Sequence, residues 1–163
     1  MRTSFLVVFS LLTVAACSGR TSAPAVPTSS SRFTPTILAG TWTGSSTDTS
    51  GQANMTWTLS PSGDTVTGAT TFSNTARGMM GNGSMQGTVG ETTMTFHMTV
   101  PTGGFTGMMS PCSMGVDGQA TLSSDGHTMT GTYSGSLSGM MSGGMMGQSC
   151  GGAMNNGQFT LTR

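Results

Sequence analysis

Apolar and polar residues alternate along most of the chain after residue 37. Four segments show this pattern, the first two strictly and the others more weakly: 53–60, 93–100, 128–133 and 158–162. In the first of them Met55, Trp57 and Leu59 occupy every second position, between Asn, Thr and Ser. A period of two is typical of antiparallel strands with one buried and one solvated face. We therefore expect an apolar core and a Thr-rich outer face, with Trp42 and Trp57 buried. On the same strands we expect four exposed threonines: Thr41, Thr43, Thr56 and Thr58.

Short clusters of Gly, Pro, Ser, Asp and Glu separate the alternating segments. They occur at 61–64, 90–91 and 124–127, and such clusters favour turns between strands. No segment beyond the first 16 residues has helical periodicity. The sequence therefore predicts an all-β domain over residues 37–163.

An internal repeat supports this fold class. Residues 58–68 match 121–131 at an offset of 63, and the same offset aligns two further pairs: 40–44 with 103–107 and 96–99 with 159–162. We interpret this as two homologous halves of four or five strands each. Gly68 and Gly131 recur in the first pair, where a mid-strand glycine usually marks a bend or bulge.

Two such halves can close on each other and remove their edge strands. The repeat therefore predicts an antiparallel up-and-down β-barrel of about 8–10 strands. A sandwich of two sheets is the alternative.

The first expected strand begins Gly40-Thr41-Trp42. This resembles the G-x-W signature of the calycins, the lipocalin and avidin-like barrels, although the resemblance covers only a few residues. In those barrels an Arg from the last strand, or just beyond it, packs across that Trp. The resemblance implies that Arg163 closes the barrel on Trp42 through a cation–π contact.

The N-terminus has the features of an export signal. Arg2 precedes an apolar run over 5–12 that is too short to span a membrane. The run leads to Val14-Ala15-Ala16-Cys17, which resembles the bacterial lipobox. The resemblance implies a signal peptide over 1–16 and a lipid-modified Cys17 as the new N-terminus. Ser18, where an Asp would mark inner-membrane retention, implies the outer membrane. An ordinary secretory signal is the alternative.

The remaining N-terminal stretch and the two other cysteines complete the organisation. Residues 17–36 are rich in Ser, Thr and Pro and have no periodicity, as expected of a flexible tether. Cys112 and Cys150 form an even pair in an oxidising compartment, which favours a disulfide. Two free thiols or a thiolate metal site are the alternatives.

Composition narrows the function. Only 6% of the residues are charged, with no Lys, and the net charge is zero, which excludes a basic nucleic-acid binder. The tether and the β-domain together hold few groups for acid–base chemistry: Asp48, Asp64, Glu91, His97, Asp117, Asp125 and His127. Asp64 and Asp125 belong to expected turns, and His97 to a solvated strand face. We therefore expect a protein that is not an enzyme.

Methionine is unusually frequent, with 16 residues. Four of these are expected in the core: Met55, Met94, Met98 and Met129. Most of the others fall in Gly/Ser-rich segments interpreted as loops, among them Met85 and Met114. Thioethers are soft ligands for Cu(I) and Ag(I), and six loop methionines are candidate ligands: Met79, Met80, Met140, Met141, Met145 and Met146. Packing over the barrel ends is the alternative role, and no other cofactor is expected.

The sequence thus predicts a non-catalytic, lipid-anchored lipoprotein of the bacterial cell envelope, acting as a structural or binding module. Its membrane contact is the lipid anchor, no nucleic acid is expected, and its partner is a protein or a small apolar ligand. Cu(I) or Ag(I) binding is the first alternative. The second is carriage of a small hydrophobic ligand inside the barrel, among these side chains: Met55, Trp57, Leu59, Phe72, Phe96, Met98, Leu122, Tyr133 and Phe159.

Overall fold

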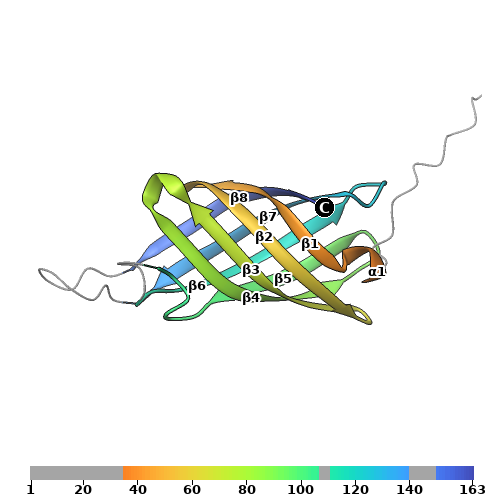
Figure 1. The fold of residues 1–163 in the computed structure, drawn as a ribbon, viewed down its shortest axis with the longest axis horizontal. Coiled ribbons are helices and arrows are strands. Elements are labelled where there is room, and N and C mark those ends of the chain that lie inside the picture. Colours follow the sequence, from red (N-terminus) through yellow and green to blue (C-terminus); the bar gives the residue numbers. More distant parts are fainter. Residues whose placement is uncertain (1–34, 107–110, 140–149) are drawn as a thin grey trace, which may run out of the picture.

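Eight antiparallel strands close into a barrel in the computed structural model, which describes residues 35–106, 111–139 and 150–163 (Figure 1). Each strand pairs with its sequence neighbours, and the last pairs with the first. The strands are β1 (Gly40–Asp48), β2 (Gly51–Ser62), β3 (Thr65–Asn74), β4 (Met79–Val89), β5 (Thr93–Val100), β6 (Ser113–Leu122), β7 (Thr128–Ser138) and β8 (Gly152–Thr162). The predicted up-and-down barrel is confirmed, and the two-sheet sandwich is wrong.

The inner face of the barrel carries the apolar half of the alternating pattern. Trp42 and Trp57 are fully buried, as predicted. The threonines beside them face outward, and all are exposed except Thr56, which is half-buried. The Trp57 ring lies 5.0 Å from the rings of both Phe96 and Phe159, measured between centroids. Because aromatic rings favour tilted and edge-on packing at such distances, these three side chains fill the middle of the barrel.

The two ends of the barrel differ. At one end, which we call the capped end, β1 begins and three turns join the strands, at 63–64, 90–92 and 123–127. The helix α1 (Pro35–Leu38) lies here (Figure 1). At the opposite end, which we call the methionine end, β4 begins with two methionines. The other described connecting residues lie at that end: 49–50, 75–78 with the 3₁₀ helix η1 (Thr75–Arg77), 101–106, 111–112, 139 and 150–151.

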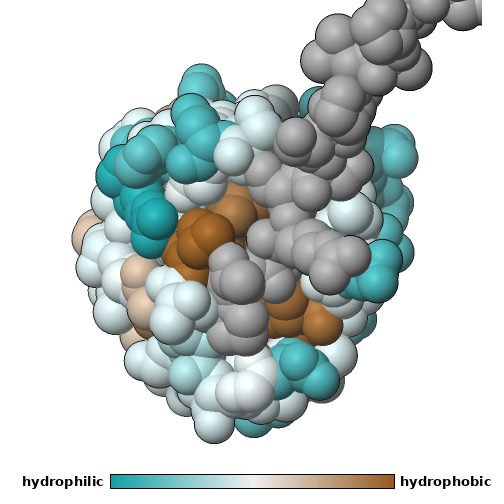
Figure 2. Space-filling model, turned by 90° about the vertical axis from the view of Figure 1, so that its right-hand side faces the viewer, coloured by the Kyte–Doolittle hydropathy of each residue, from teal (hydrophilic) through white to brown (hydrophobic). Residues whose placement is uncertain are grey.

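Helix α1 closes the capped end. Leu38 is fully buried, and its carbonyl oxygen accepts a hydrogen bond from the Trp42 indole N–H at 3.0 Å. The Arg163 guanidinium lies 5.2 Å from the centroid of the Trp42 ring and donates to the Ile37 carbonyl at 2.6 Å. The expected Arg163–Trp42 contact is therefore present. Figure 2 looks onto this end, where hydrophobic residues gather at the centre and polar residues surround them.

The helix also corrects an expectation, because residues 35 and 36 were assigned to the tether and no helix was expected. One turn of four residues is too short to show a helical period. It forms because Leu38 gains full burial over the barrel end, at roughly 1.5–3 kcal/mol for such a side chain.

The internal repeat corresponds to the structure only in part. The offset of 63 places β2 on β6 and β3 on β7, four strands apart around the barrel. However, Gly68 pairs with Leu59, whereas Gly131 pairs with Ala120, so the two hairpins differ in register by two residues. The other two aligned blocks do not match, since residues 103–106 belong to no strand and β5 is aligned with β8, three strands away.

Glycines on the inner face make room for aromatic rings on the neighbouring strand. A Cβ atom on Gly131 would lie 2.5 Å from the ring of Phe159, its cross-strand partner. Three other glycines have the same relation to a paired ring: Gly81 to Phe72, Gly118 to Phe96 and Gly157 to Tyr133. Gly131 therefore marks a close approach rather than the expected bulge. The register shift in this region falls between Tyr133 and Gly135.

Candidate functional site

Methionines at the methionine end lie on strands rather than in the expected loops. Met79, Met80 and Met85 belong to β4, and Met114 belongs to β6. Met85 is 1% and Met114 5% exposed, so both are core residues. The other inner positions of β4 are mainly glycines: the Phe72 ring of β3 crosses Gly81, and the backbone of β5 approaches Gly83 closely. The strand therefore shows no alternation of large apolar residues, and sequence periodicity does not reveal it.

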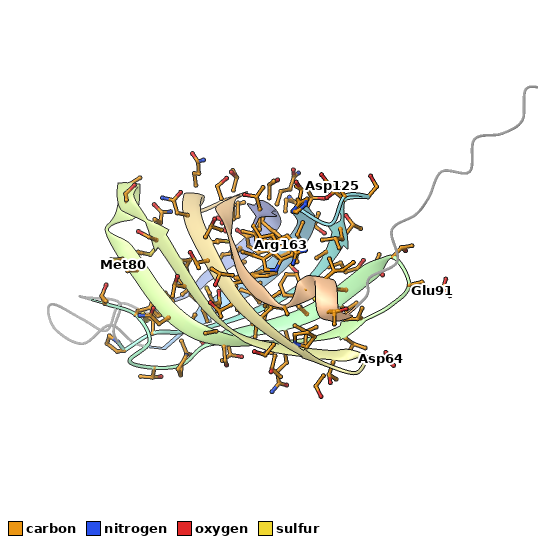
Figure 3. The ribbon with its side chains drawn as sticks, turned by 45° about the vertical axis from the view of Figure 1, so that its right-hand side comes forward. Asp64, Met80, Glu91, Asp125 and Arg163 are labelled. Atoms are coloured by element: carbon orange, nitrogen blue, oxygen red, sulfur yellow. A yellow bond between two sulfur atoms is a disulfide. The ribbon has the colours of Figure 1, made fainter. Side chains whose placement is uncertain are left out.

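The six predicted metal ligands do not form one described group. Met79 and Met80 are neighbours on β4 and point to opposite faces of the barrel wall. Met79 lines the interior, whereas Met80 is 55% exposed at the rim of the barrel (Figure 3). The remaining four lie outside the described residues: Met140, Met141, Met145 and Met146. Met79 and Met80 therefore face opposite sides of the wall, and the six-methionine ligand set stays a prediction.

A disulfide holds two connections together at the methionine end. Cys112 and Cys150 are bonded, with their Cα atoms 5.8 Å apart, which confirms the predicted pairing. The Cys150 backbone N–H also donates to the Gly139 carbonyl at 2.9 Å. The bond thus ties the residue before β6 to the segment that leads into β8, two strands away around the barrel.

Residues 104–106 fold over the mouth of the barrel at this end. The Phe105 side chain is buried, and its ring lies 5.6 Å from that of Phe72 in an edge-on arrangement. Backbone hydrogen bonds hold the segment against β4, from Asn82 N–H to Gly104 O at 2.8 Å and from Thr106 N–H to Met80 O at 3.0 Å. Phe105 therefore acts as a plug.

Behind this plug lies an interior cavity of about 40 Å³. Five methionines line it: Met55, Met79, Met98, Met114 and Met154. Five polar residues also border it: Ser46, Asp48, Ser50, Asn74 and Tyr133. Ligand pockets for drug-sized molecules have about 300–1,000 Å³, so this cavity has room only for an ion, a few waters or a very small ligand.

Asp48 organises the polar side of the cavity. Its Oδ2 accepts a hydrogen bond from the Tyr133 hydroxyl at 2.7 Å. Its Oδ1 accepts from the Ser50 backbone N–H at 2.6 Å and from the Ser50 hydroxyl. Burial raises the pKa of Tyr133 well above its ordinary value, and the adjacent Asp48 carboxylate adds to this rise. Tyr133 therefore stays a neutral hydrogen-bond donor at physiological pH, and the cavity edge carries one negative group.

The outer face of the barrel is polar and carries a second cluster. His97 Nδ1 lies 2.7 Å from Asp117 Oδ1, and the Thr99 hydroxyl lies 3.1 Å from His97 Nε2. Asp117 reaches His97 only through the pairing of β5 with β6, so the pattern of the sequence does not bring the two residues together. Knowing that strand register would have revealed the pair.

The order carboxylate, imidazole, hydroxyl is that of a hydrolase triad, but its surroundings differ. The side chains of His97 and Asp117 are 57% and 79% exposed, so bulk water surrounds the pair. Electrostatic catalysis needs preorganised donors in a water-excluded site, which this convex strand face does not provide. The Asp117 contact thus orients the His97 ring on the surface.

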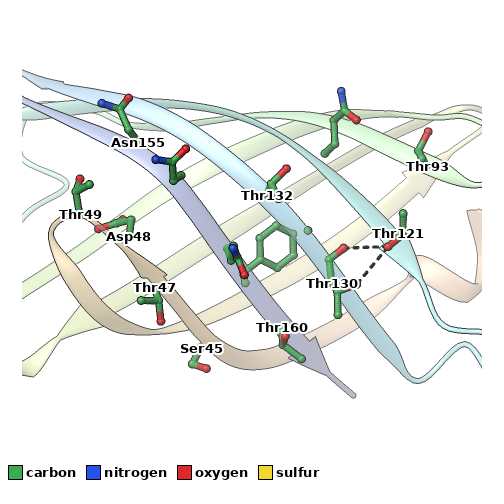
Figure 4. A pocket seen from close by; sticks show the side chains of 15 residues that line it. Ser45, Thr47, Asp48, Thr49, Thr93, Thr121, Thr130, Thr132, Asn155 and Thr160 are labelled. Carbon is green, nitrogen blue, oxygen red and sulfur yellow. Dashed lines mark hydrogen bonds between the residues drawn. The ribbon is translucent and has the colours of Figure 1, made fainter.

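A shallow groove runs along the outer face beside this cluster, across β1, β8, β7 and β6 (Figure 4). Hydroxyl and amide side chains line it, and Thr121 and Thr130 hydrogen-bond across β6 and β7. Such a surface hydrogen-bonds readily with water, and its side chains include one carboxylate, that of Asp48, at the edge.

Acidic residues gather on the turns of the capped end. Asp64, Glu91 and Asp125 lie on the three turns there (Figure 3). Hydrogen bonds from the Ser123 hydroxyl and the His127 backbone N–H lower the pKa of Asp125. These contacts are those of a tight turn, which fits the expectation that Asp125 serves turn formation.

Comparisons of the chain with protein-family models, with curated proteins and with solved structures find no match. In the described ranges, no group of three or more His, Cys, Asp or Glu side chains is placed to hold a metal ion. No helix among the described residues is long and apolar enough to cross a membrane.

Proposed function

We propose that this chain is a non-catalytic lipoprotein of a bacterial cell envelope, anchored through an acylated Cys17, whose barrel serves as a binding module. The lipobox-like residues before Cys17 support the anchor, and Ser18 supports the outer membrane. The barrel supports the module, because its interior is filled by side chains apart from a cavity of about 40 Å³. A small hydrophobic ligand of ordinary size does not fit there, so the structure does not favour a carrier.

One observation carries the proposal: α1, with which the described part of the chain begins, and the methionine end lie at opposite ends of the barrel. The chain enters the fold through α1, which covers the capped end (Figure 1). If Cys17 is in the membrane, the chain reaches the barrel from the lipid at the capped end, and the methionine end is the end farther from this point of attachment. Met80 is the large apolar side chain that is exposed among the described residues, and it lies at this distal rim. Its side chain is therefore accessible to a partner at that end.

The anchor is tested by replacing Cys17→Ser in the full-length chain. We expect loss of the acyl mass in intact-protein mass spectrometry and release of the protein from membranes. The double variant Cys112→Ser/Cys150→Ser is the matched control, because it removes the other two cysteines and leaves Cys17 in place. A Cys17→Ser protein that is still acylated and membrane-bound would contradict the anchor.

The binding surface is tested in cells with a photo-crosslinking amino acid placed at Met80 or at Thr41. Thr41 is exposed on β1 at the capped end, so the two positions compare the two ends. We expect discrete crosslinked products from position 80 and few from position 41. Equal products from both positions, or none from position 80, would contradict a distal binding surface.

Soft-metal binding is the second candidate function. It is favoured by the five thioethers around the interior cavity and not by the loop methionines alone.

A further inference from the structure

We infer that the cavity at the methionine end is a binding site for a soft monovalent metal ion of the Cu(I) class, held by thioether sulfurs. The ligands come from the methionines that line the cavity: Met55, Met79, Met98, Met114 and Met154. All five belong to the part of the chain that the structure describes. The site is independent of the proposed anchor and of the distal binding surface.

The thioethers come from five different strands. Met55 lies on β2, Met79 on β4, Met98 on β5, Met114 on β6 and Met154 on β8. Only the closed barrel brings them around one space, since they span 100 residues of sequence from 55 to 154. Thioethers are soft ligands that suit Cu(I), whereas Ca²⁺ and Mg²⁺ require a shell of oxygen ligands. The donor set therefore selects a soft ion.

The other buried methionines show what packing alone looks like. Met85, Met94 and Met129 are each at most 1% exposed and do not line the cavity. Protein interiors are close-packed, and methionine is flexible enough to fill irregular gaps. Around these three methionines the interior is closely packed, as expected where methionine only fills space. At the methionine end five such side chains surround a space that remains open.

The charge at the cavity edge matches a monovalent cation. Neutral thioethers cannot compensate a buried positive charge, and an uncompensated charge is costly in an apolar interior. Asp48 supplies one carboxylate at the border of the cavity, where Tyr133 and Ser50 donate hydrogen bonds to it. These donors fix the carboxylate in place, so the site combines soft neutral ligands with one negative charge.

The two cysteines nearest the cavity do not compete as ligands, because Cys112 and Cys150 are bonded to each other. Ag(I) is a simpler probe than Cu(I), because it has the same charge and soft character but does not oxidise in air. We use the full-length protein with Cys17→Ser, which removes the remaining thiol, in chloride-free buffer. Titration with silver nitrate is expected to give one site with a dissociation constant below about 1 µM.

Two matched double variants locate the site. Met98→Leu/Met114→Leu removes two cavity sulfurs, and we expect affinity to fall at least about 10-fold, since even residues behind a metal ligand change affinity by 10–100-fold. Met94→Leu/Met129→Leu removes two buried sulfurs away from the cavity and should leave affinity unchanged. Leucine keeps a similar apolar volume in both pairs, and circular dichroism checks that each variant is folded.

Three outcomes overturn the inference. The first is an absence of binding at silver concentrations at least 10-fold above the expected upper limit of the dissociation constant, about 1 µM. The second is an equal loss of affinity in both double variants. The third is unchanged binding by the cavity variant together with lost binding when the four methionines at 140, 141, 145 and 146 become Leu, which would move the site to that segment.

A measurement on the chain with its methionines intact keeps the test valid if a variant fails to fold. With ¹³C-labelled methionine methyl groups, Ag(I) should shift the resonances of Met98 and Met114 and leave those of Met94 and Met129 in place. Shifts confined to other methionines would contradict the cavity site.

Discussion

The two ends of this barrel are built from the same eight strands but are closed in different ways. At the capped end, α1, Trp42 and Arg163 close the barrel through an indole hydrogen bond, a cation–π contact and the buried Leu38 side chain. At the methionine end, Phe105 and a disulfide close the mouth over a cavity lined by thioethers and a carboxylate. One end is thus closed by close packing, whereas the other keeps a small space inside it.

The chemistry of the side chains explains this division. Trp and Leu have defined shapes and pack closely, whereas Met has three rotatable bonds and specifies shape poorly. A disulfide stabilises the fold chiefly by restricting the unfolded chain, whatever the local packing. The methionine end therefore keeps an open interior while the Cys112–Cys150 bond supplies stability that close packing supplies at the capped end.

The largest effect that tests this comparison is expected from Trp42→Ala. The change removes a fully buried indole, its hydrogen bond to Leu38 and the surface on which Arg163 stacks. Large-to-small changes of this kind cost about 3–5 kcal/mol. Urea unfolding should show this loss, and Thr41→Ala, an exposed neighbour, should change stability by less than about 0.5 kcal/mol. A loss below 1 kcal/mol for Trp42→Ala would mean that the cap is not needed.

The next effect is expected from Cys112→Ser/Cys150→Ser. Loss of a disulfide that spans 38 residues should lower the free energy of unfolding by about 2–4 kcal/mol. Hydrogen exchange should show where the protection is lost: amides at the starts of β6 and β8 should exchange faster, while those around Trp42 stay protected. Uniform loss of protection over both ends would contradict the separation of roles.

Much of the fold could be predicted from the sequence, because apolar residues alternate with threonines along the clearest strands. Local patterns predict the strand at 53–60 and the turns. The resemblance of Gly40-Thr41-Trp42 to the calycin signature predicts the Trp42–Arg163 contact. β4 could not be recognised, since its inner positions include Gly81 and Gly83, which make room for the Phe72 ring and for the backbone of β5 on the neighbouring strands. The one-turn α1 is too short for any periodic signal.

The candidate sites were less accessible to sequence reasoning. The cavity depends on how side chains from five strands fill a volume, and no spacing in the sequence encodes a volume. Met114 was assigned to a loop, although it is 5% exposed on β6, because the glycines around it resemble loop composition. The His97–Asp117 pair depends on the register of β5 and β6, which alternation alone does not determine.

A smaller effect on stability is expected from adding a methyl group at two glycines, one away from the cavity and one beside it. In Gly131→Ala the new Cβ would lie 2.2 Å from the Gln119 backbone oxygen and 2.5 Å from the Phe159 ring, and overpacking of this kind costs about 1–3 kcal/mol. In Gly81→Ala the three nearest atoms all belong to the Phe72 ring, and Phe72 borders the cavity. That ring can move into open space.

We therefore expect Gly81→Ala to cost less than Gly131→Ala by at least about 1 kcal/mol in urea unfolding. The two substitutions are chemically identical, so they control for each other. Equal losses would show that the cavity does not relieve strain and that both regions are equally rigid.

The smallest effect is the pH dependence of stability that arises from Tyr133 at the polar edge of the cavity. Burial and the Asp48 carboxylate raise the pKa of Tyr133, above an ordinary value of about 10. The folded state therefore holds the phenol proton more tightly than the unfolded state. This contribution to stability is fully present below pH 10 and is lost as pH rises from about 10 through the folded-state pKa. Solvent near the barrel mouth screens the charges, so the loss at pH 11 should be under about 1 kcal/mol.

Because Tyr133 is the chain's one tyrosine, absorbance at 295 nm reports its ionisation alone. We expect the midpoint of the alkaline titration to lie above 10 in the folded protein and to return towards that value in concentrated urea. Asp48→Asn should lower the folded-state midpoint, because it removes the charge that opposes the phenolate while retaining a side-chain oxygen that can accept the hydroxyl hydrogen bond. A folded-state midpoint equal to that in urea would mean that Tyr133 is solvated and that the cavity edge is open to water.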